Sequence, residues 1–122
     1  MPPDIMLLAA EWQPRALMRA QLIEDGFDVL GTETWPATRR HLKRGIVPRI
    51  VIVDLKGLPD PARVLDDLRA LMDPGHVLVL AAAGTVGRRD LERQGFHVLS
   101  RPFAINDLVG GSRRLLARIE DL

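Results

Sequence analysis

The sequence predicts an α/β fold, in which one parallel sheet carries helices on both of its faces. Apolar runs alternate with longer helical stretches along the whole chain. Three of these runs are continuously apolar, which is typical of strands that are covered on both faces. Proline or glycine stands near the points where one element gives way to the next. The length of 122 residues predicts a single domain, residues 1–122.

The apolar runs predict five strands. These runs are residues 5–10, 27–31, 49–54, 76–82 and 96–100. The first, third and fourth contain the continuous apolar segments, whereas polar residues interrupt the second and the fifth. Since a helical stretch separates each strand from the next, we expect parallel neighbours joined by right-handed crossovers.

The first three helical stretches are amphipathic to different degrees. The first, residues 12–25, is predicted to bury Ala16, Ala20 and Ile23, which recur at helical spacing. The second is predicted to begin at about Pro36, because proline suits the first turn of a helix. The third has a clear apolar stripe. That stripe consists of Leu65, Leu68, Leu71 and Met72.

The last two helical stretches are less regular. Residues 86–94 contain only Val86 and Leu91 as large apolar residues, so this helix is predicted to be the shortest or loosest. The last stretch contains Gly110 and Gly111, each of which costs about 1 kcal/mol relative to alanine inside a helix. Either this helix starts after the glycines or another group packs closely against them. Its apolar positions are Leu108, Leu115, Leu116 and Ile119.

The composition excludes several classes of protein. The absence of cysteine excludes disulfides, zinc–thiolate sites and thiol nucleophiles. The 17 basic and 16 acidic residues give a net charge of +1, which provides no general field for nucleic acid. No apolar run approaches the roughly 20 residues that span a bilayer, and no secretory signal is recognised. We therefore expect a cytoplasmic protein that binds neither nucleic acid nor a membrane.

The predicted strands end in residues that set the chemistry of the domain. In an open parallel sheet, ligands gather at the carboxyl ends of the strands. Most of the side chains there are small or apolar, but one carboxylate and one guanidinium stand out. The residues at these ends include Ala9, Ala10, Glu11, Asp54, Ala81 and Arg101.

Over residues 5–119 the chain resembles the receiver domains of response regulators, which have the CheY-like, flavodoxin-like fold. Residues 51–54 (VIVD) resemble the strand that ends in the phosphoacceptor aspartate of that family. Residues 98–103 (VLSRPF) resemble its fifth strand and the Lys-Pro-Phe that follows. The resemblance implies a doubly wound, five-stranded parallel sheet in the order 2-1-3-4-5. It also implies a cis bond between Arg101 and Pro102.

The chain lacks most of the groups with which this family takes up phosphate. The family holds Mg²⁺ with an acidic pair and the acceptor aspartate, contacts the phosphoryl group with a hydroxyl, and neutralises it with a lysine. By resemblance, Ala9 and Ala10 stand at the acidic pair, Ala81 at the hydroxyl and Arg101 at the lysine. Only Asp54 is unchanged.

This loss predicts that the site takes up neither metal nor phosphate. Attack of a carboxylate on a negatively charged phosphoryl group requires a metal ion and cations that offset the repulsion. Asp54, even with help from Glu11, is a poor site for Mg²⁺, which prefers several oxygen ligands in near-octahedral geometry. We therefore expect no metal and no other cofactor. Arg101 is expected to hold Asp54 in a bidentate ion pair.

The resemblance implies a signal-transduction protein of the two-component type. With its site incomplete, we interpret the chain as a stand-alone pseudo-receiver that acts through phosphorylation-independent protein–protein interaction and is not an enzyme. The partner would be a histidine kinase, a regulator, another signalling protein or a second copy of the chain. The family uses its fourth helix, fifth strand and fifth helix as the partner face. The residues expected near that face are Arg88, Arg93, Ser100, Val109 and Arg113.

Three alternatives stay open. The first is a phosphorylatable response regulator, with Asp54 as phosphoacceptor and a rebuilt, weak Mg²⁺ site. The second is a small-molecule binder or enzyme with an apolar pocket lined by Ala9, Ala10, Ala81 and Trp12, since a fold does not by itself decide function. The third is a DNA-binding regulator, whose binding would depend steeply on salt.

The two tryptophans stand at predicted junctions between a loop and a helix. Trp12 is expected to pack over the alanine-lined pocket. Trp35 is expected to cap a pocket, fill space or anchor a partner, because tryptophan is suited to all three roles.

Overall fold

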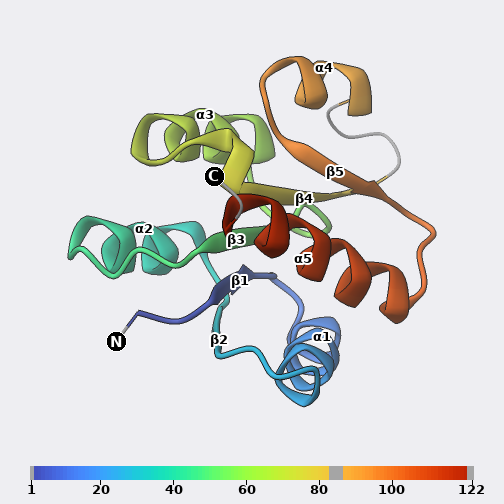
Figure 1. Ribbon diagram of the computed structural model, residues 1–122. Helices are drawn as coiled ribbons and strands as arrows, with labels where there is room; N and C mark the ends of the chain where they lie inside the picture. Colours follow the sequence, from blue (N-terminus) through green and yellow to red (C-terminus); the bar gives the residue numbers. More distant parts are fainter. Residues whose placement is uncertain (1, 83–86, 121–122) are drawn as a thin grey trace.

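The five strands form one parallel sheet in the order β2-β1-β3-β4-β5, which confirms the predicted fold class and strand order (Figure 1). The computed structural model describes residues 2–82 and 87–120. The strands are β1 (Ile5–Leu8), β2 (Val29–Thr32), β3 (Ile50–Asp54), β4 (Val77–Ala81) and β5 (His97–Ser100). In β1, β3 and β4 every residue is buried, as their continuously apolar sequences predict.

Helices cover both faces of this sheet. They are α1 (Trp12–Glu24), α2 (Trp35–Lys43), α3 (Pro61–Leu71), α4 (Arg88–Arg93) and α5 (Ile105–Glu120), with a short 3-10 turn, η1 (Pro74–His76), before β4. Of the described α-helices, α4 is the shortest, as predicted; Val86, at its predicted start, lies outside the described residues. None of the helices in the described part of the chain could cross a membrane.

The sheet separates two hydrophobic cores. Neighbouring residues of a strand point to opposite faces, so Met6 and Leu8 lie in one core and Ile5 and Leu7 in the other. The first core is covered by α2, α3 and α4, and the second by α1 and α5. The carboxyl ends of β3 and β4 lie at one edge of the sheet, and the candidate functional site is at this edge.

Helix α1 buries a different stripe from the one predicted. Met18 and Leu22 are buried, whereas Ala16, Ala20 and Ile23 are exposed, Ile23 by 42%. The side chains of methionine and leucine remove more apolar area from water than alanine does. The helix therefore turns this pair toward the sheet, and the prediction for Ala16, Ala20 and Ile23 was wrong.

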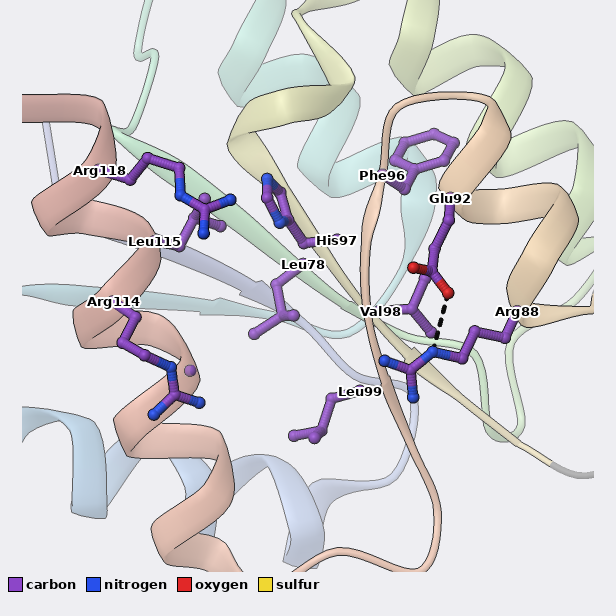
Figure 2. A pocket seen from close by; sticks show the side chains of 11 residues that line it. Leu78, Arg88, Glu92, Phe96, His97, Val98, Leu99, Arg114, Leu115 and Arg118 are labelled. Atoms are coloured by element: carbon purple, nitrogen blue, oxygen red, sulfur yellow. Dashed lines mark hydrogen bonds and ion pairs between the residues drawn. The ribbon is translucent and has the colours of Figure 1, made fainter. Parts of the chain in front are cut away.

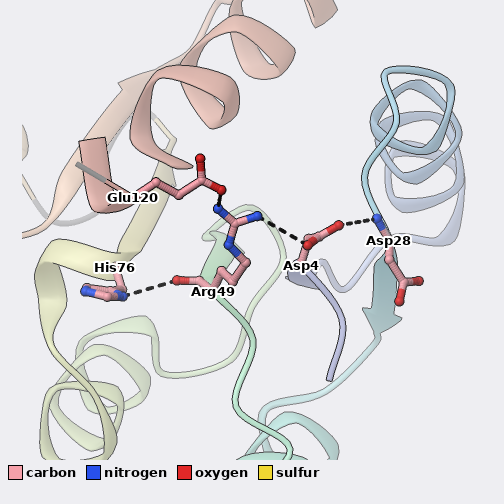
Figure 3. Close-up of polar contacts among 5 residues, drawn as sticks. All are labelled: Asp4, Asp28, Arg49, His76 and Glu120. Atoms are coloured by element: carbon pink, nitrogen blue, oxygen red, sulfur yellow. Dashed lines mark hydrogen bonds and ion pairs between the residues drawn. The ribbon is translucent and has the colours of Figure 1, made fainter. Parts of the chain in front are cut away.

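A polar cluster joins the opposite, amino-terminal ends of the strands to the end of α5 (Figure 3). Arg49 forms ion pairs with Asp4, at 3.4 Å between Nη1 and Oδ1, and with Glu120. Asp4 also accepts a hydrogen bond from the backbone N–H of Asp28 at 2.9 Å, and His76 Nδ1 contacts the Arg49 carbonyl oxygen at 3.2 Å. The ion pairs are partly exposed and are expected to contribute little to stability. The cluster lies at the edge away from the candidate site.

Helix α5 runs without a break through Gly110 and Gly111, so it does not start late. The guanidinium group of Arg114 lies against both glycines. A Cβ atom added at Gly110 would stand 3.3 Å from Arg114 Nη1, and one at Gly111 would stand 3.9 Å from Nη2. The glycines thus leave room for an arginine that folds back along its own helix.

Two glycine substitutions are predicted to have opposite effects on stability. Gly110→Ala is expected to raise the free energy of unfolding by about 0.5–1 kcal/mol, because alanine favours a helix and the end of Arg114 can move aside. Gly95→Ala is expected to lower it by about 1–2 kcal/mol, since Gly95 has φ +98° and its new Cβ would stand 3.0 Å from Pro74 Cγ. Urea denaturation measures both changes. Destabilisation by Gly110→Ala would contradict this account of Arg114.

Candidate functional site

Asp54 is the last residue of β3, and its side chain is almost completely buried at the carboxyl edge of the sheet. Both of its carboxylate oxygens are bound by the guanidinium of Arg101. Arg101 Nη1 donates to Oδ1 and Nη2 donates to Oδ2, each at 2.7 Å. The backbone N–H of Lys56 donates a third hydrogen bond to Oδ1 at 3.0 Å. The predicted bidentate pair is confirmed, and its paired short bonds are of the strong, charge-assisted kind.

Arg101 is held in place by its own neighbours. It follows β5, and its backbone N–H donates to the carbonyl oxygen of Ala81 at 3.1 Å. Its guanidinium lies 5.2 Å from the ring centroid of Phe103, a distance suited to a cation–π contact. The bond between Arg101 and Pro102 is cis, as expected. These contacts direct the guanidinium toward Asp54.

The positions expected to carry an acidic pair contribute only backbone groups. Ala9 is buried and accepts a hydrogen bond on its carbonyl oxygen from Arg15 Nη1 at 2.8 Å. Its own N–H donates to the carbonyl oxygen of Thr32 at 3.1 Å. The guanidinium of Arg15 thus binds the backbone just after the end of β1, and its position within α1 gives no local signal for this contact. A cation here offers no ligand to a metal ion.

Glu11 lies between β1 and α1 at this edge, and it is paired with a lysine. Its Oε1 lies 3.8 Å from Lys56 Nζ, and both side chains are about half exposed. It makes no side-chain hydrogen bond that caps α1. In residues 2–82 and 87–120, no group of three or more His, Cys, Asp or Glu residues is placed to hold a metal ion.

The two tryptophans lie in contrasting surroundings. Trp12 is 67% exposed and lines two open grooves, one of which includes Ala10 but neither of which includes Ala9 or Ala81. The expectation that it packs over a pocket formed by these three alanines was wrong, because its side chain stays largely exposed. Trp35 is only 9% exposed and fills space in the core under α2 and α3.

On the expected partner face, a residue of α4 contacts a residue of β5. Arg88 Nε lies 2.9 Å from Glu92 Oε1, and Arg88 Nη1 lies 3.5 Å from Ser100 Oγ. Arg93 is exposed and pairs with Asp90 at 3.3 Å. Arg88 and Ser100 are therefore neighbours, whereas the ion pair of Arg93 is within its own helix.

The two α5 residues expected on that face lie elsewhere. Arg113 is ion-paired with Asp25, at the end of α1, and Val109 packs against the core that α1 and α5 cover. Residues four apart share a helix face, so both belong to the α1 side of α5. The prediction for Val109 and Arg113 was wrong because the rotation of α5 about its axis is set by its packing. The residues that α5 turns toward β5 are Gly111, Arg114, Leu115 and Arg118.

His97, in β5, has a pKa below the ordinary value of a histidine. Partial burial lowers its pKa below the ordinary value, and the positive charge of Arg118 lowers it further. A backbone hydrogen bond with Gly75 acts in the opposite direction. The neutral imidazole is therefore favoured beside the arginines of α5.

Comparison with known proteins gives matches in structure. No protein-family model matches the chain, and no curated protein matches it in sequence. The signal receiver domain assigned to a Luxo repressor protein from Vibrio parahaemolyticus is 23% identical, with a TM-score of 0.78 over 98% of this chain and 94% of that one. A response regulator receiver domain protein from Clostridium thermocellum is 20% identical, with a TM-score of 0.78 over 95% of both chains.

A larger protein contains the same fold as one of its parts. NtrX from Brucella abortus is 21% identical and superposes with a TM-score of 0.81 over 98% of this chain. This chain spans only 28% of the length of that NtrX chain. At these identities the matches show the fold.

Proposed function

We propose that this chain, whose fold is that of response-regulator receiver domains, is a pseudo-receiver that transmits signals by protein–protein interaction without phosphotransfer. In this proposal it is not an enzyme and uses no metal or cofactor. Its location would be the cytoplasm, which the cysteine-free sequence favours.

The bidentate pair between Arg101 and Asp54 is the observation that carries this proposal. A carboxylate that attacks phosphorus must present a free oxygen, and here each oxygen accepts a bond of 2.7 Å from the guanidinium. The planar guanidinium matches the carboxylate in geometry as well as in charge, so it occupies both oxygens at once. The alanines at positions 9 and 10 provide no side-chain oxygen that could bring Mg²⁺ to this carboxylate. Asp54 is thus better suited to hold β3 and β5 together than to accept phosphate.

The partner surface in this proposal is formed by α4, β5 and the β5-facing side of α5. The partner would be a histidine kinase, a regulator, another signalling protein or a second copy of the chain. Arg88, Arg93 and Ser100 would belong to this surface, and from α5 it would include Arg114 and Arg118 in place of Val109 and Arg113. Because Asp54 is permanently paired, the surface would be available in one state rather than switched by phosphorylation.

The proposal is tested by the mass of the intact protein after incubation with a small phosphodonor and Mg²⁺. We expect no phosphoryl adduct, because Arg101 binds both oxygens of Asp54 and alanines stand at positions 9 and 10. A receiver domain with a complete acidic site, treated in parallel, is the positive control and should gain one phosphoryl group.

The same experiment tests the alternative function, a phosphorylatable response regulator. That alternative predicts a stoichiometric adduct that disappears in Asp54→Asn. Such a result would overturn the pseudo-receiver proposal and assign Asp54 as phosphoacceptor. An adduct that persists in Asp54→Asn would place the modification on another residue and leave Asp54 unmodified.

A further inference from the structure

A cavity of about 230 Å³ lies between α4 and α5, above β5 (Figure 2). Three leucines supply apolar lining: Leu78 from β4, Leu99 from β5 and Leu115 from α5. The space exists partly because Gly111, which also lines the cavity, has no side chain. The volume is smaller than that of a typical drug-sized ligand site, so it suits one small charged group.

The rim of this cavity carries unbalanced positive charge. Arg88 and Glu92 pair with one another at 2.9 Å, so their charges offset. Within the described part of the chain, Arg114 and Arg118 form no ion pair, although both line the cavity. Figure 2 shows Arg118 extending toward His97. Arg114 lies nearer to Leu99 than Arg118 does. With neutral His97, the charged groups around the cavity sum to two positive charges.

We propose that this cavity binds a dianionic phosphate group, held by Arg114 and Arg118. Two guanidinium groups that form no ion pair with the described residues match a dianion in charge, and guanidinium donates paired hydrogen bonds to phosphate oxygens. Arg114 folds back over Gly110 and Gly111, although its side chain, like that of Arg118, is exposed. A phosphate would therefore contact both arginines from the open side of the cavity, beside the leucines of its lining.

This inference goes beyond the proposed function and does not depend on it. The cavity contains neither Asp54 nor Arg101, so phosphorylation of Asp54 would leave its lining intact. Both the anion and the proposed protein partner would meet the chain on the α4, β5 and α5 surface. A bound phosphate dianion would neutralise the two positive charges that Arg114 and Arg118 give to this surface.

The test is a titration of the full chain with inorganic phosphate, followed by NMR of the backbone amides at constant ionic strength and slightly alkaline pH. We expect saturable shifts that centre on Gly111, Arg114 and the β5 residues of the cavity. Arg114→Gln and Arg118→Gln are each expected to weaken binding about tenfold or more, because each removes a charge-assisted bond. Arg113→Gln is the matched control, since it removes the same charge from the α1 side of the same helix. It should change the affinity less than twofold.

His97 provides a second, independent readout. A dianion beside Arg118 offsets the charge that lowers the pKa of His97, so bound anion should raise that pKa. Sulfate serves as the probe here because it stays dianionic throughout the titration. His41 and His76, which do not line the cavity, are internal controls and should not shift.

The results distinguish a specific phosphate site from non-specific attraction of anions to exposed arginines. Shifts that do not saturate, or an equal loss of affinity in Arg113→Gln, would overturn it. Saturable binding that is lost in Arg114→Gln and Arg118→Gln supports it, and two further probes then identify the source of the phosphate. Tighter binding of glycerol phosphate than of N-acetylphosphoserine amide indicates a small metabolite, and the reverse indicates a phosphorylated protein.

Discussion

Arg101→Ala is expected to lower the free energy of unfolding by about 3 kcal/mol. The substitution leaves the carboxylate of Asp54, whose side chain is only 4% exposed, with the Lys56 N–H as its remaining hydrogen-bond donor among residues 2–82 and 87–120. A buried charge without a counter-charge is costly because water cannot solvate it. Urea denaturation of the wild type and the variant at neutral pH measures the loss.

A double-mutant cycle isolates the contribution of the pair. Asp54→Ala and Arg101→Ala together should cost less than the sum of the single changes, since the double variant contains no unpaired charge. Arg88→Ala is the matched control, because it removes an exposed ion pair with Glu92 and should cost less than about 1 kcal/mol. Additive effects of the two changes at Asp54 and Arg101 would show that the pair contributes nothing specific.

Trp35→Ala is expected to lower the free energy of unfolding by about 3–5 kcal/mol. The indole lies in the core under α2 and α3, and its Nε1 donates to Asp67 Oδ2 at 3.1 Å. Alanine leaves a cavity between these helices and removes the hydrogen bond that joins them. Thermal or urea denaturation, followed by circular dichroism, measures the change.

Trp12→Ala is the control for this prediction, because it removes the same side chain from a position that is 67% exposed. We expect its effect on stability to stay within about 0.5 kcal/mol. If the two tryptophan variants lost similar stability, Trp12 would have to be packed as tightly as Trp35. Trp12 would then be buried at the carboxyl edge of the sheet and not exposed there.

The pairing of Asp54 with Arg101 could be predicted from the sequence for a topological reason. Both residues follow apolar runs, and the carboxyl ends of parallel strands meet at one edge of a sheet. The strand order then decides which ends are close, and the resemblance to receiver domains supplied that order. Arg15, in contrast, sits within a helix, where nothing in the local sequence indicates that its side chain reaches the Ala9 carbonyl.

The errors have a shared cause, which is the rotation of helices about their own axes. Ala16 and Ala20 follow the spacing of an apolar face, yet Met18 and Leu22 occupy the buried one. On α5, Arg113 turns to α1 while Arg114 turns to the cavity above β5. Spacing predicts which residues share a face, but only packing decides which face is inward.

The sequence by itself determined the alternation of strands and helices and placed alanines at positions 9 and 10, where the family has its acidic pair. Both are local properties, since each depends on residue types and their spacing along the chain. The tertiary structure alone decided that Trp35 is buried and Trp12 exposed, and that Arg114 and Arg118 line one cavity. These outcomes depend on residues that are far apart in the sequence. The close-packed layers have room for only some of the apolar side chains, and which ones are buried is decided when the helices pack on the sheet.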